Sequence, residues 1–187
     1  GRFIDWICFM MKSFDNGYTW KNFGTPPHFP EYTFIRPTIV KKNGDILTPY
    51  QYYPVTKEEH DRVKFEEEAP KKYIGTNTQT PYCESGVLYS TDGGKTYERY
   101  TSCRMDMSDG WIWSEPTVAE LSDGSVSMLM RKNRTGWLYR CDSPDGGKTW
   151  GEKHALTPRM DASFAYNCPR ISTLPSGELI IICDVLN

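Results

Sequence analysis

The residues most able to do chemistry are a carboxylate and a guanidinium near the middle of the chain, Glu115 and Arg131. Between them lies the segment 122–124, Ser-Asp-Gly, whose residue types are typical of a tight turn. If two antiparallel strands pair about Asp123, Glu115 lies directly opposite Arg131 and both side chains point to the same face. Such a pair could accept a proton and bind an anionic group. It could equally be an ordinary salt bridge between strands.

The same construction gives two further hairpins whose polar and aromatic residues reach an equivalent rim. Pairing about 43–44 brings Arg36 close to Gln51, and pairing about Ser176 brings Asn167 toward Asp184. Carboxylate, guanidinium and aromatic groups at one rim are compatible with a sugar site, although the tyrosines could simply pack within strands. Beside Glu115 and Arg131, the residues that we expect to contact a substrate there are Arg36, Tyr50, Tyr52, Tyr53, Asn167 and Arg170.

The composition indicates an ordinary folded protein. The 187 residues include 22 Lys and Arg and 24 Asp and Glu, for a net charge of -2. We therefore expect no nucleic-acid partner that is bound through a strong basic field. The longest apolar runs, 6–11 and 179–183, are much shorter than the ~20 residues of a membrane span, so we expect no span. Aromatic residues at 14%, with 15 Gly and 13 Pro, favour an all-β protein rich in turns.

Three segments share the pattern S-x-D-x-G-x-T-aromatic, and we call them boxes 1 to 3. The Asp can accept hydrogen bonds from backbone N–H groups of a tight turn, the Gly supplies a positive φ, and the hydroxyl groups can close the turn. The aromatic residue is expected to pack inward. A calcium loop needs more oxygen ligands, so we interpret the boxes as structural. Box 1 comprises Ser13, Asp15, Gly17, Thr19 and Trp20; box 2 comprises Ser90, Asp92, Gly94, Thr96 and Tyr97; box 3 comprises Ser143, Asp145, Gly147, Thr149 and Trp150.

The spacing of the boxes predicts a repeat architecture. A proline-led strand and a turn glycine follow each box, as in Pro116 and Gly124 after box 2. A period near ~50 residues with four short strands per repeat predicts the blades of a β-propeller. The longer interval between boxes 1 and 2 fits one insertion at about 57–80, which is rich in charged residues and is expected to be solvated.

The cysteines and histidines give no metal pattern. The six cysteines are scattered without a C-x-x-C pair, and the three histidines are isolated, so we expect no metal and no cofactor. Two readings of the cysteines stay open. They are buried free thiols in strands, or one or two disulfides of an extracellular protein link some of them.

The three boxes, together with the segment 113–124 and Arg131, resemble the Asp-box (BNR) repeats of the sialidase, or neuraminidase, superfamily. The resemblance covers almost the whole chain and implies a six-bladed propeller of four-stranded antiparallel blades. At ~50 residues per blade such a propeller needs ~300 residues. We therefore expect residues 1–187 to be a central fragment that holds about half of it. The family favours a secreted or periplasmic location, which the sequence itself leaves open.

The resemblance also implies an activity, the removal of terminal sialic acid by an exo-α-sialidase. In that family a Tyr nucleophile is activated by a Glu, three Arg bind the substrate carboxylate, and an Asp acts as acid and base. Glu115 matches the activating Glu and Arg131 the second Arg. Arg36 and Arg170 match neither remaining Arg, and no residue here is assigned as the acid Asp or the nucleophilic Tyr. We expect these to lie outside the chain, which alone would be inactive.

Two alternatives remain beside a sialidase. The boxes are specific for a fold rather than for an activity, and non-catalytic propellers that bind glycans or proteins through the same rim carry them as well. A box-containing glycosidase of other sugar specificity is the second alternative. It would use paired acidic residues and would not need Arg131 for an acidic substrate.

Overall fold

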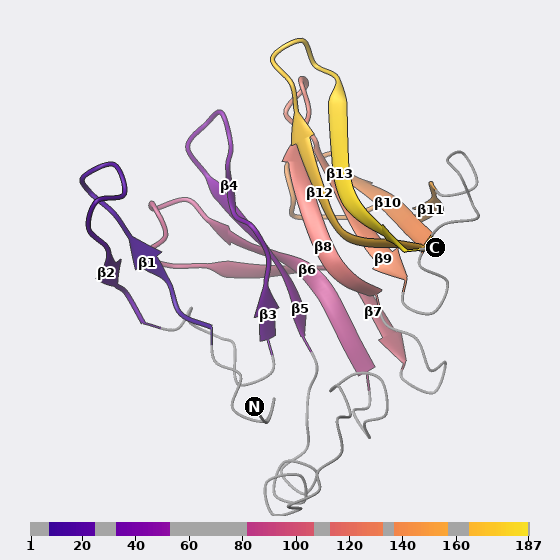
Figure 1. Cartoon of the computed structure of the whole chain (residues 1–187), viewed down its shortest axis with the longest axis horizontal. Coiled ribbons are helices and arrows are strands. Elements are labelled where there is room, and N and C mark those ends of the chain that lie inside the picture. The colour runs from indigo at the N-terminus through magenta and orange to yellow at the C-terminus, as the bar shows by residue number, and fades with distance from the viewer. Residues whose placement is uncertain are drawn as a thin grey trace, which may run out of the picture.

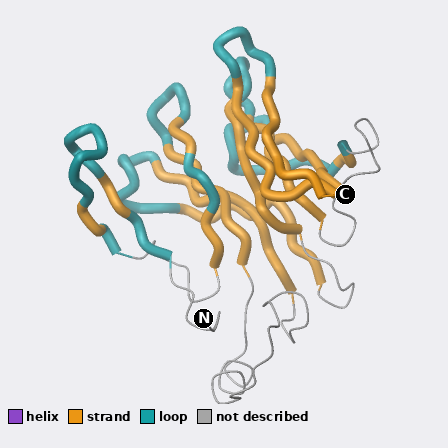
Figure 2. The backbone as a smooth tube through the Cα atoms, viewed as in Figure 1, coloured by secondary structure: helices purple, strands orange, loops and turns teal. Residues whose placement is uncertain are grey.

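The computed structural model describes residues 8–24, 33–52, 82–106, 113–132, 137–156 and 165–186. Within these ranges every regular element is a β-strand, and turns and loops connect the strands (Figure 2). The all-β prediction is therefore confirmed for this part of the chain, where no helix is long and apolar enough to cross a membrane. Tyr53 and the predicted insertion at about 57–80 lie outside the described residues.

Two antiparallel sheets make up most of the structure (Figure 1). Because β3 and β4 both pair with β5, they share one strand position, so the first sheet is four strands wide. This sheet has the order β3-β5-β6-β7, and its strands are β3 (Thr33–Ile35), β4 (Ile39–Val40), β5 (Ile46–Tyr52), β6 (Tyr82–Ser90) and β7 (Glu98–Asp106). The second sheet has the order β8-β9-β10-β11, with β8 (Trp113–Glu120), β9 (Val126–Lys132), β10 (Trp137–Ser143) and β11 (His154–Ala155).

Two strand pairs flank these sheets. One is β12 (Ala165–Thr173) with β13 (Leu179–Leu186), and the other is β1 (Met11–Lys12) with β2 (Lys21–Asn22). Strand β8 contacts β5 on one side and β12 on the other. The hairpins β4–β5, β8–β9 and β12–β13 thus lie next to one another, and their turns gather at one end of the molecule (Figure 1). The opposite ends of these strands form the rim on which the predicted site residues were expected.

The main core lies between the two sheets. It includes Leu47 from β5, Val87 from β6, Val118 from β8 and Met128 from β9, each at most 1% exposed. Alternate residues of each strand point to this interface, so one apolar face per sheet is removed from water. Cys103 and Cys141 join the same cluster as free thiols. For these two cysteines the buried-thiol reading is confirmed.

The boxes form the predicted turns. In box 2 the Ser90 hydroxyl donates to Asp92 (2.8 Å), and the hydroxyl and backbone N–H of Thr96 both donate to the same carboxylate, at 2.7 and 2.9 Å. Box 3 repeats these bonds around Asp145, and box 1 repeats them around Asp15. A side chain here takes the place of backbone partners, which fixes a turn that would otherwise leave N–H groups unpaired.

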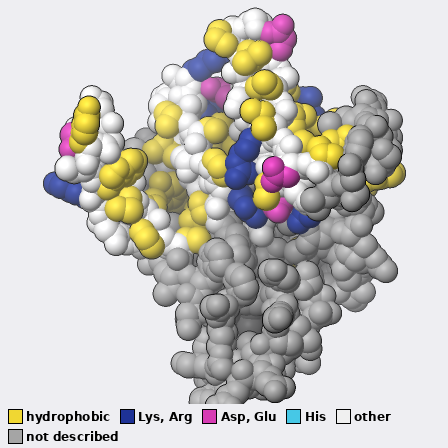
Figure 3. All heavy atoms as spheres, in the orientation of Figure 1, with side chains coloured by type: hydrophobic (Ala, Val, Ile, Leu, Met, Phe, Trp, Pro, Cys, Tyr) yellow, Lys and Arg dark blue, Asp and Glu magenta, His cyan; other side chains and the backbone are white. Residues whose placement is uncertain are grey.

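The aromatic residues of the boxes do not all pack inward. Tyr97 is 8% exposed, and Trp150 packs against the main core, as predicted. Trp20 is 57% exposed, so the prediction is wrong for box 1. Its indole N–H donates to the carbonyl oxygen of Gly17 (3.0 Å), which holds the ring over its own turn. Hydrophobic side chains are visible over the β1–β2 hairpin in Figure 3, and several of them are exposed among the described residues.

Asp145 should stabilise the fold only while its carboxylate is ionised. The backbone N–H of Thr149 and further bonds within box 3 hold the pKa of Asp145 well below its ordinary value of 3.8. As the pH falls below about 4, the unfolded chain therefore binds a proton before the folded one, and this stabilisation is lost. We predict that Asp145→Asn lowers the melting temperature by a few degrees at neutral pH. In thermal melts the gap to the wild type should narrow as the pH falls from about 4 toward 2.

Asp142→Asn is the matched control, because Asp142 lies in β10, the strand that leads into box 3, and forms an exposed ion pair with Arg140. It should change the melting temperature little at any pH. A gap for Asp145→Asn that stays constant down to pH 2 would contradict the role assigned to the ionised carboxylate.

Candidate functional site

In each of the three hairpins, the chain of the first strand is interrupted at a residue that precedes proline. Pairing shifts in β8 between Ser114 and Thr117, and in β12 between Asn167 and Arg170. Glu115 and Cys168 lie in these bulges and adopt left-handed backbone conformations, with φ of 54° and 45°. Arg36-Pro37 marks the equivalent break between β3 and β4. Proline has no N–H for the ladder, and a bulge turns the neighbouring side chain out of the regular alternation.

The bulge corrects the predicted register while keeping the predicted contact. From Thr117 to Glu120 the strands pair about Asp123 as expected, but beyond the bulge Ser114, not Glu115, lies opposite Arg131. The extra residue in β8 causes this shift by one position. The Glu115 side chain nevertheless meets Arg131, with Nε of Arg131 3.0 Å from Oε2 of Glu115. Both side chains are mostly buried, at 12% and 23% exposed.

A hydrogen-bonded network surrounds the Glu115 carboxylate. The backbone N–H of Cys168 donates to its Oε2 (2.7 Å), and the Cys168 thiol approaches its Oε1 at 3.5 Å. Arg131 also donates through Nη1 to the side-chain oxygen of Asn167. The second and third hairpins are thereby joined at the rim. Glu115 is held from three directions, by the guanidinium, the backbone amide and the thiol.

The first hairpin joins the network through Gln51. The side-chain oxygen of Gln51 accepts a hydrogen bond from Nη2 of Arg36 (3.2 Å) and another from the backbone N–H of Glu115 (2.6 Å). The predicted approach of Arg36 to Gln51 is thus confirmed at the level of side chains. In the ladder itself Phe34, not Arg36, pairs with Gln51, because Arg36 lies in the break before Pro37. Arg36, Glu115, Arg131 and Asn167 are the predicted site residues that the structure brings together.

Three other predicted residues that the structure describes, Arg170, Tyr50 and Tyr52, make different contacts. Arg170 donates to the carbonyl oxygen of Pro169 (2.9 Å). Tyr50 is fully buried, and its hydroxyl donates to Glu84 (2.6 Å). Tyr52 lies beside Arg99, whose guanidinium carbon is 5.0 Å from the ring centre. Successive side chains of a strand point to opposite faces, so Tyr50 and Tyr52 face away from the side to which Gln51 points. The placement of these two tyrosines in the sugar rim is therefore wrong.

Tyr50 belongs to a second polar cluster, on the far face of the first sheet. Glu84 accepts from Tyr50, from Nε of Arg99 (2.7 Å) and from Thr101 (2.8 Å). Burial raises the pKa of Tyr50, and the bond to Glu84 raises it further. Burial alone would raise the pKa of Glu84, but its donors lower it overall. A buried phenol with a raised pKa is a poor nucleophile, so we interpret this cluster as structural.

Three residues of the rim were not identified as site residues from the sequence. In the sequence, Gln51 and Asp184 serve only to locate the rim, and Cys168 is one of six scattered cysteines. Cys168 precedes Pro169 just as Glu115 precedes Pro116, and this parallel was visible in the sequence. Burial raises the pKa of the Cys168 thiol, and the negative charges of Glu115 and Asp184 add to the rise, whereas Arg36 opposes it. Asp184 pairs with Asn167 and is exposed.

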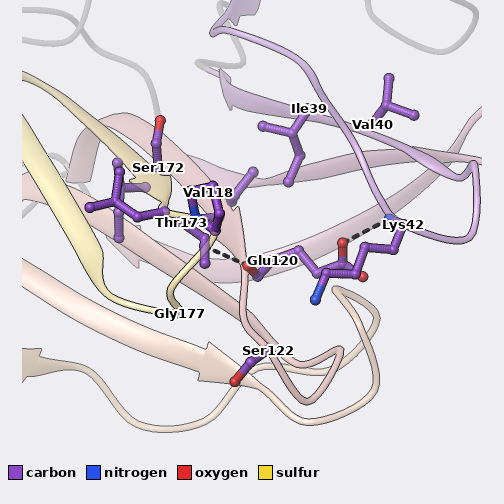
Figure 4. A pocket seen from close by; sticks show the side chains of 13 residues that line it. Ile39, Val40, Lys42, Val118, Glu120, Ser122, Ser172, Thr173 and Gly177 are labelled. Carbon is purple, nitrogen blue, oxygen red and sulfur yellow. Dashed lines mark hydrogen bonds between the residues drawn. The ribbon is translucent and has the colours of Figure 1, made fainter.

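The turn ends of the same hairpins enclose a different pocket, of about 370 Å³ (Figure 4). In its wall the backbone N–H of Lys42 donates to the carboxylate of Glu120 (2.8 Å). Thr173 donates to the carbonyl oxygen of Glu120 across the next hairpin. The walls are otherwise apolar and hydroxyl side chains, such as Ile39 and Val118. The chemical groups are therefore concentrated at the other end of β8, around Glu115.

In the described part of the chain, no group of three or more His, Cys, Asp or Glu side chains is arranged to hold a metal ion. Lys and Arg side chains stand next to Asp and Glu side chains in the middle of the face that Figure 3 shows. The contacts around Glu115 give the rim the chemistry of a fixed carboxylate beside guanidinium groups. It can accept a proton and bind an anion.

Comparison with known proteins agrees with the resemblance drawn from the sequence. A protein of Bacteroides fragilis (strain YCH46) named sialidase is 34% identical over 94 residues, which are 50% of this chain and 16% of that protein. A Hadza microbial sialidase superposes with a TM-score of 0.60 at 18% identity, covering 94% of this chain and 30% of that one. An α-L-arabinanase of Penicillium chrysogenum, complexed with arabinobiose, gives 0.63 at 15% identity, with coverages of 95% and 49%.

No family model matches the chain. The chain resembles sialidases in sequence, and it shares its all-β fold of four-stranded antiparallel sheets with a sialidase and an arabinanase. It spans about half the length of the arabinanase and less than a third of either sialidase.

The contact between Cys168 and Glu115 makes a prediction about thiol reactivity. Because the Glu115 charge helps to raise the pKa of Cys168, Glu115→Gln should lower that pKa and increase the thiolate fraction. We predict that iodoacetamide modifies Cys168 a few-fold faster in this variant at pH 8, as measured by mass spectrometry. Cys183 is an internal control, since its pKa is raised by burial and by Asp184. Equal acceleration at both cysteines would indicate general loosening instead.

Proposed function

We propose that this chain is the central segment of a sialidase-type glycoside hydrolase that removes terminal sialic acid from glycoconjugates. The observation that carries the proposal is the Glu115–Arg131 pair, held at the rim where three hairpins meet. In the proposed whole protein the two described sheets are blades of a six-bladed β-propeller. The rim then lies around its axis, and sialylated glycans are the substrates.

Glu115 has the role of proton acceptor. A sialic acid carries a carboxylate at its anomeric carbon, which would repel a carboxylate nucleophile, so a tyrosine is the more suitable attacking group. In the proposal, Glu115 takes the proton of that tyrosine as it attacks. The tyrosine and the acid Asp come from the rest of the whole protein. Two supports for this role are the fixed position of Glu115 and its bonds to Arg131 and Cys168, which orient the carboxylate before substrate arrives.

Arg131 has the role of binding the substrate carboxylate. A guanidinium presents five N–H donors in a planar fork, which allows it to hold protein partners on one side and a carboxylate on another. Glu115 and Asn167 fix the orientation of that fork from the protein side. The sequence similarity to the Bacteroides sialidase supports an acidic sugar rather than a neutral one.

The role of Glu115 predicts a loss of turnover when its basicity is removed. In the whole protein, Glu115→Gln should lower kcat on a fluorogenic α-sialoside by ~10²-fold or more, because a positioned proton acceptor is lost. The matched control is Glu120→Gln. Glu120 lies in the same strand, at the end away from the rim, where it accepts from Lys42. A wild-type rate in Glu115→Gln, or an equal loss in the control, would contradict the assignment.

The role of Arg131 predicts a change in substrate preference. Arg131→Lys should weaken the binding of acidic sugars by roughly ten-fold while changing the binding of neutral ones little, since a lysine cannot form the bidentate fork. Inhibition constants of sialic acid and of a neutral sugar would measure this. Arg140→Lys serves as a control, because Arg140 pairs with Asp142 on the exposed outer side of the sheet. Equal weakening for both sugars would argue against a carboxylate-binding role.

A glycosidase of neutral sugars is the second candidate, and two observations favour it. The arabinanase shares the fold as fully as the sialidase does. Asp184 lies at the same rim as Glu115, close enough for both charges to act on Cys168. Two carboxylates on either side of a glycosidic bond can act as acid and base. Turnover of arabino-oligosaccharides with no turnover of sialosides would favour this candidate, and binding without turnover would favour a non-catalytic lectin.

A further inference from the structure

Gln51 connects the first sheet to the backbone of Glu115. It is a buried polar residue, 6% exposed, next to the last residue of strand β5 at the rim end. Its side-chain oxygen accepts two hydrogen bonds, from the Glu115 N–H at 2.6 Å and from Arg36 at 3.2 Å. Because both partners are donors, only the oxygen of the amide can face them, so the chemistry fixes which way the amide is turned. The side chain of Gln51 in the first sheet therefore binds a backbone N–H of the second sheet.

The conformation of Glu115 explains why that bond matters. A left-handed backbone is uncommon for glutamate, and such a residue keeps it only where its surroundings hold it there. In the bulge the N–H of Glu115 is directed to Gln51 on the neighbouring sheet. Removing the acceptor would leave a half-buried N–H without its partner and would favour a relaxed backbone. The carboxylate would then move relative to Arg131 and to the Cys168 amide.

We propose that Gln51 is a positioning residue, which fixes the Glu115 backbone so that its carboxylate is aimed at the reacting group. Its kinetic consequence rests on the proposed function, whereas its structural consequence does not. Gln51 also accepts a hydrogen bond from Arg36, but the proposal assigns its effect on turnover to Glu115, so that effect disappears when Glu115 has already lost its function.

The kinetic test uses two substitutions of similar length in the whole protein. Gln51→Met removes the acceptor, and Gln51→Glu keeps an oxygen at that place. We expect Gln51→Met to lower kcat on the α-sialoside by ~10-fold or more with KM changed less than ~3-fold, because a proton acceptor acts in the transition state. Gln51→Glu should restore most of the rate.

A double-mutant cycle separates positioning from general damage. In the Glu115→Gln background, Gln51→Met should cost less than ~2-fold, since the two residues act as one unit. A full additional ~10-fold loss in that background would overturn the proposal. Thr48→Val is the matched control. Thr48 lies in β5 like Gln51 but points to the opposite face, and the substitution breaks its bond to Thr38 (2.8 Å). A kcat loss in this control equal to that of Gln51→Met would also overturn it.

A crystal structure of Gln51→Met gives an answer that does not depend on activity. The proposal expects Glu115 to leave the left-handed region and its carboxylate to separate from Arg131. Unchanged φ and an unchanged ion pair would refute it. If the wild type hydrolyses no sialoside, the proposed function fails, and this structure still decides the role of Gln51.

Discussion

The candidate site depends on one backbone feature, the left-handed residue placed before proline in an inner strand. In a regular strand Glu115 would alternate with its neighbours and would not reach the next hairpin. The bulge at Glu115-Pro116 turns its carboxylate toward Arg131 on β9 and toward the backbone of Cys168 on β12. Cys168-Pro169 repeats the same feature and presents the amide that Glu115 needs. Two local irregularities therefore create a contact between strands that are not neighbours in one sheet.

The rest of the fold brings these irregularities close together and keeps them there. The apolar core between the sheets, with Leu47 and Met128 among its members, sets the distance between β5 and β8. At that distance the Gln51 side chain reaches the Glu115 N–H. The boxes lie in turns at the edges of the sheets and satisfy their own backbone groups, as Asp145 does for Thr149. They close their own turns and take no part in the hydrogen bonds around Glu115.

Features that depend on local chemistry could be predicted from the sequence, and those that depend on neighbouring sheets could not. The turns of the boxes and the hairpin about Asp123 follow from residue types within a few positions. The off-by-one register at Glu115 was missed because a pairing rule assumes one residue opposite one, which Pro116 breaks. The prediction for Tyr50 is wrong because it rests on the position of the residue along the strand and not on the face to which its side chain points. The role of Cys168 could not be predicted because it depends on the third hairpin lying beside the second. No sequence pattern within the second hairpin indicates that contact.

The most direct test of this account is a crystal structure of the whole protein with a bound sialic-acid inhibitor. The account predicts that the inhibitor carboxylate lies within hydrogen-bond distance of the Arg131 guanidinium, and that a tyrosine hydroxyl lies between Glu115 and the anomeric carbon. An inhibitor bound at the turn end, near Glu120, would contradict the central claim. So would an inhibitor at the rim whose carboxylate faces away from Arg131.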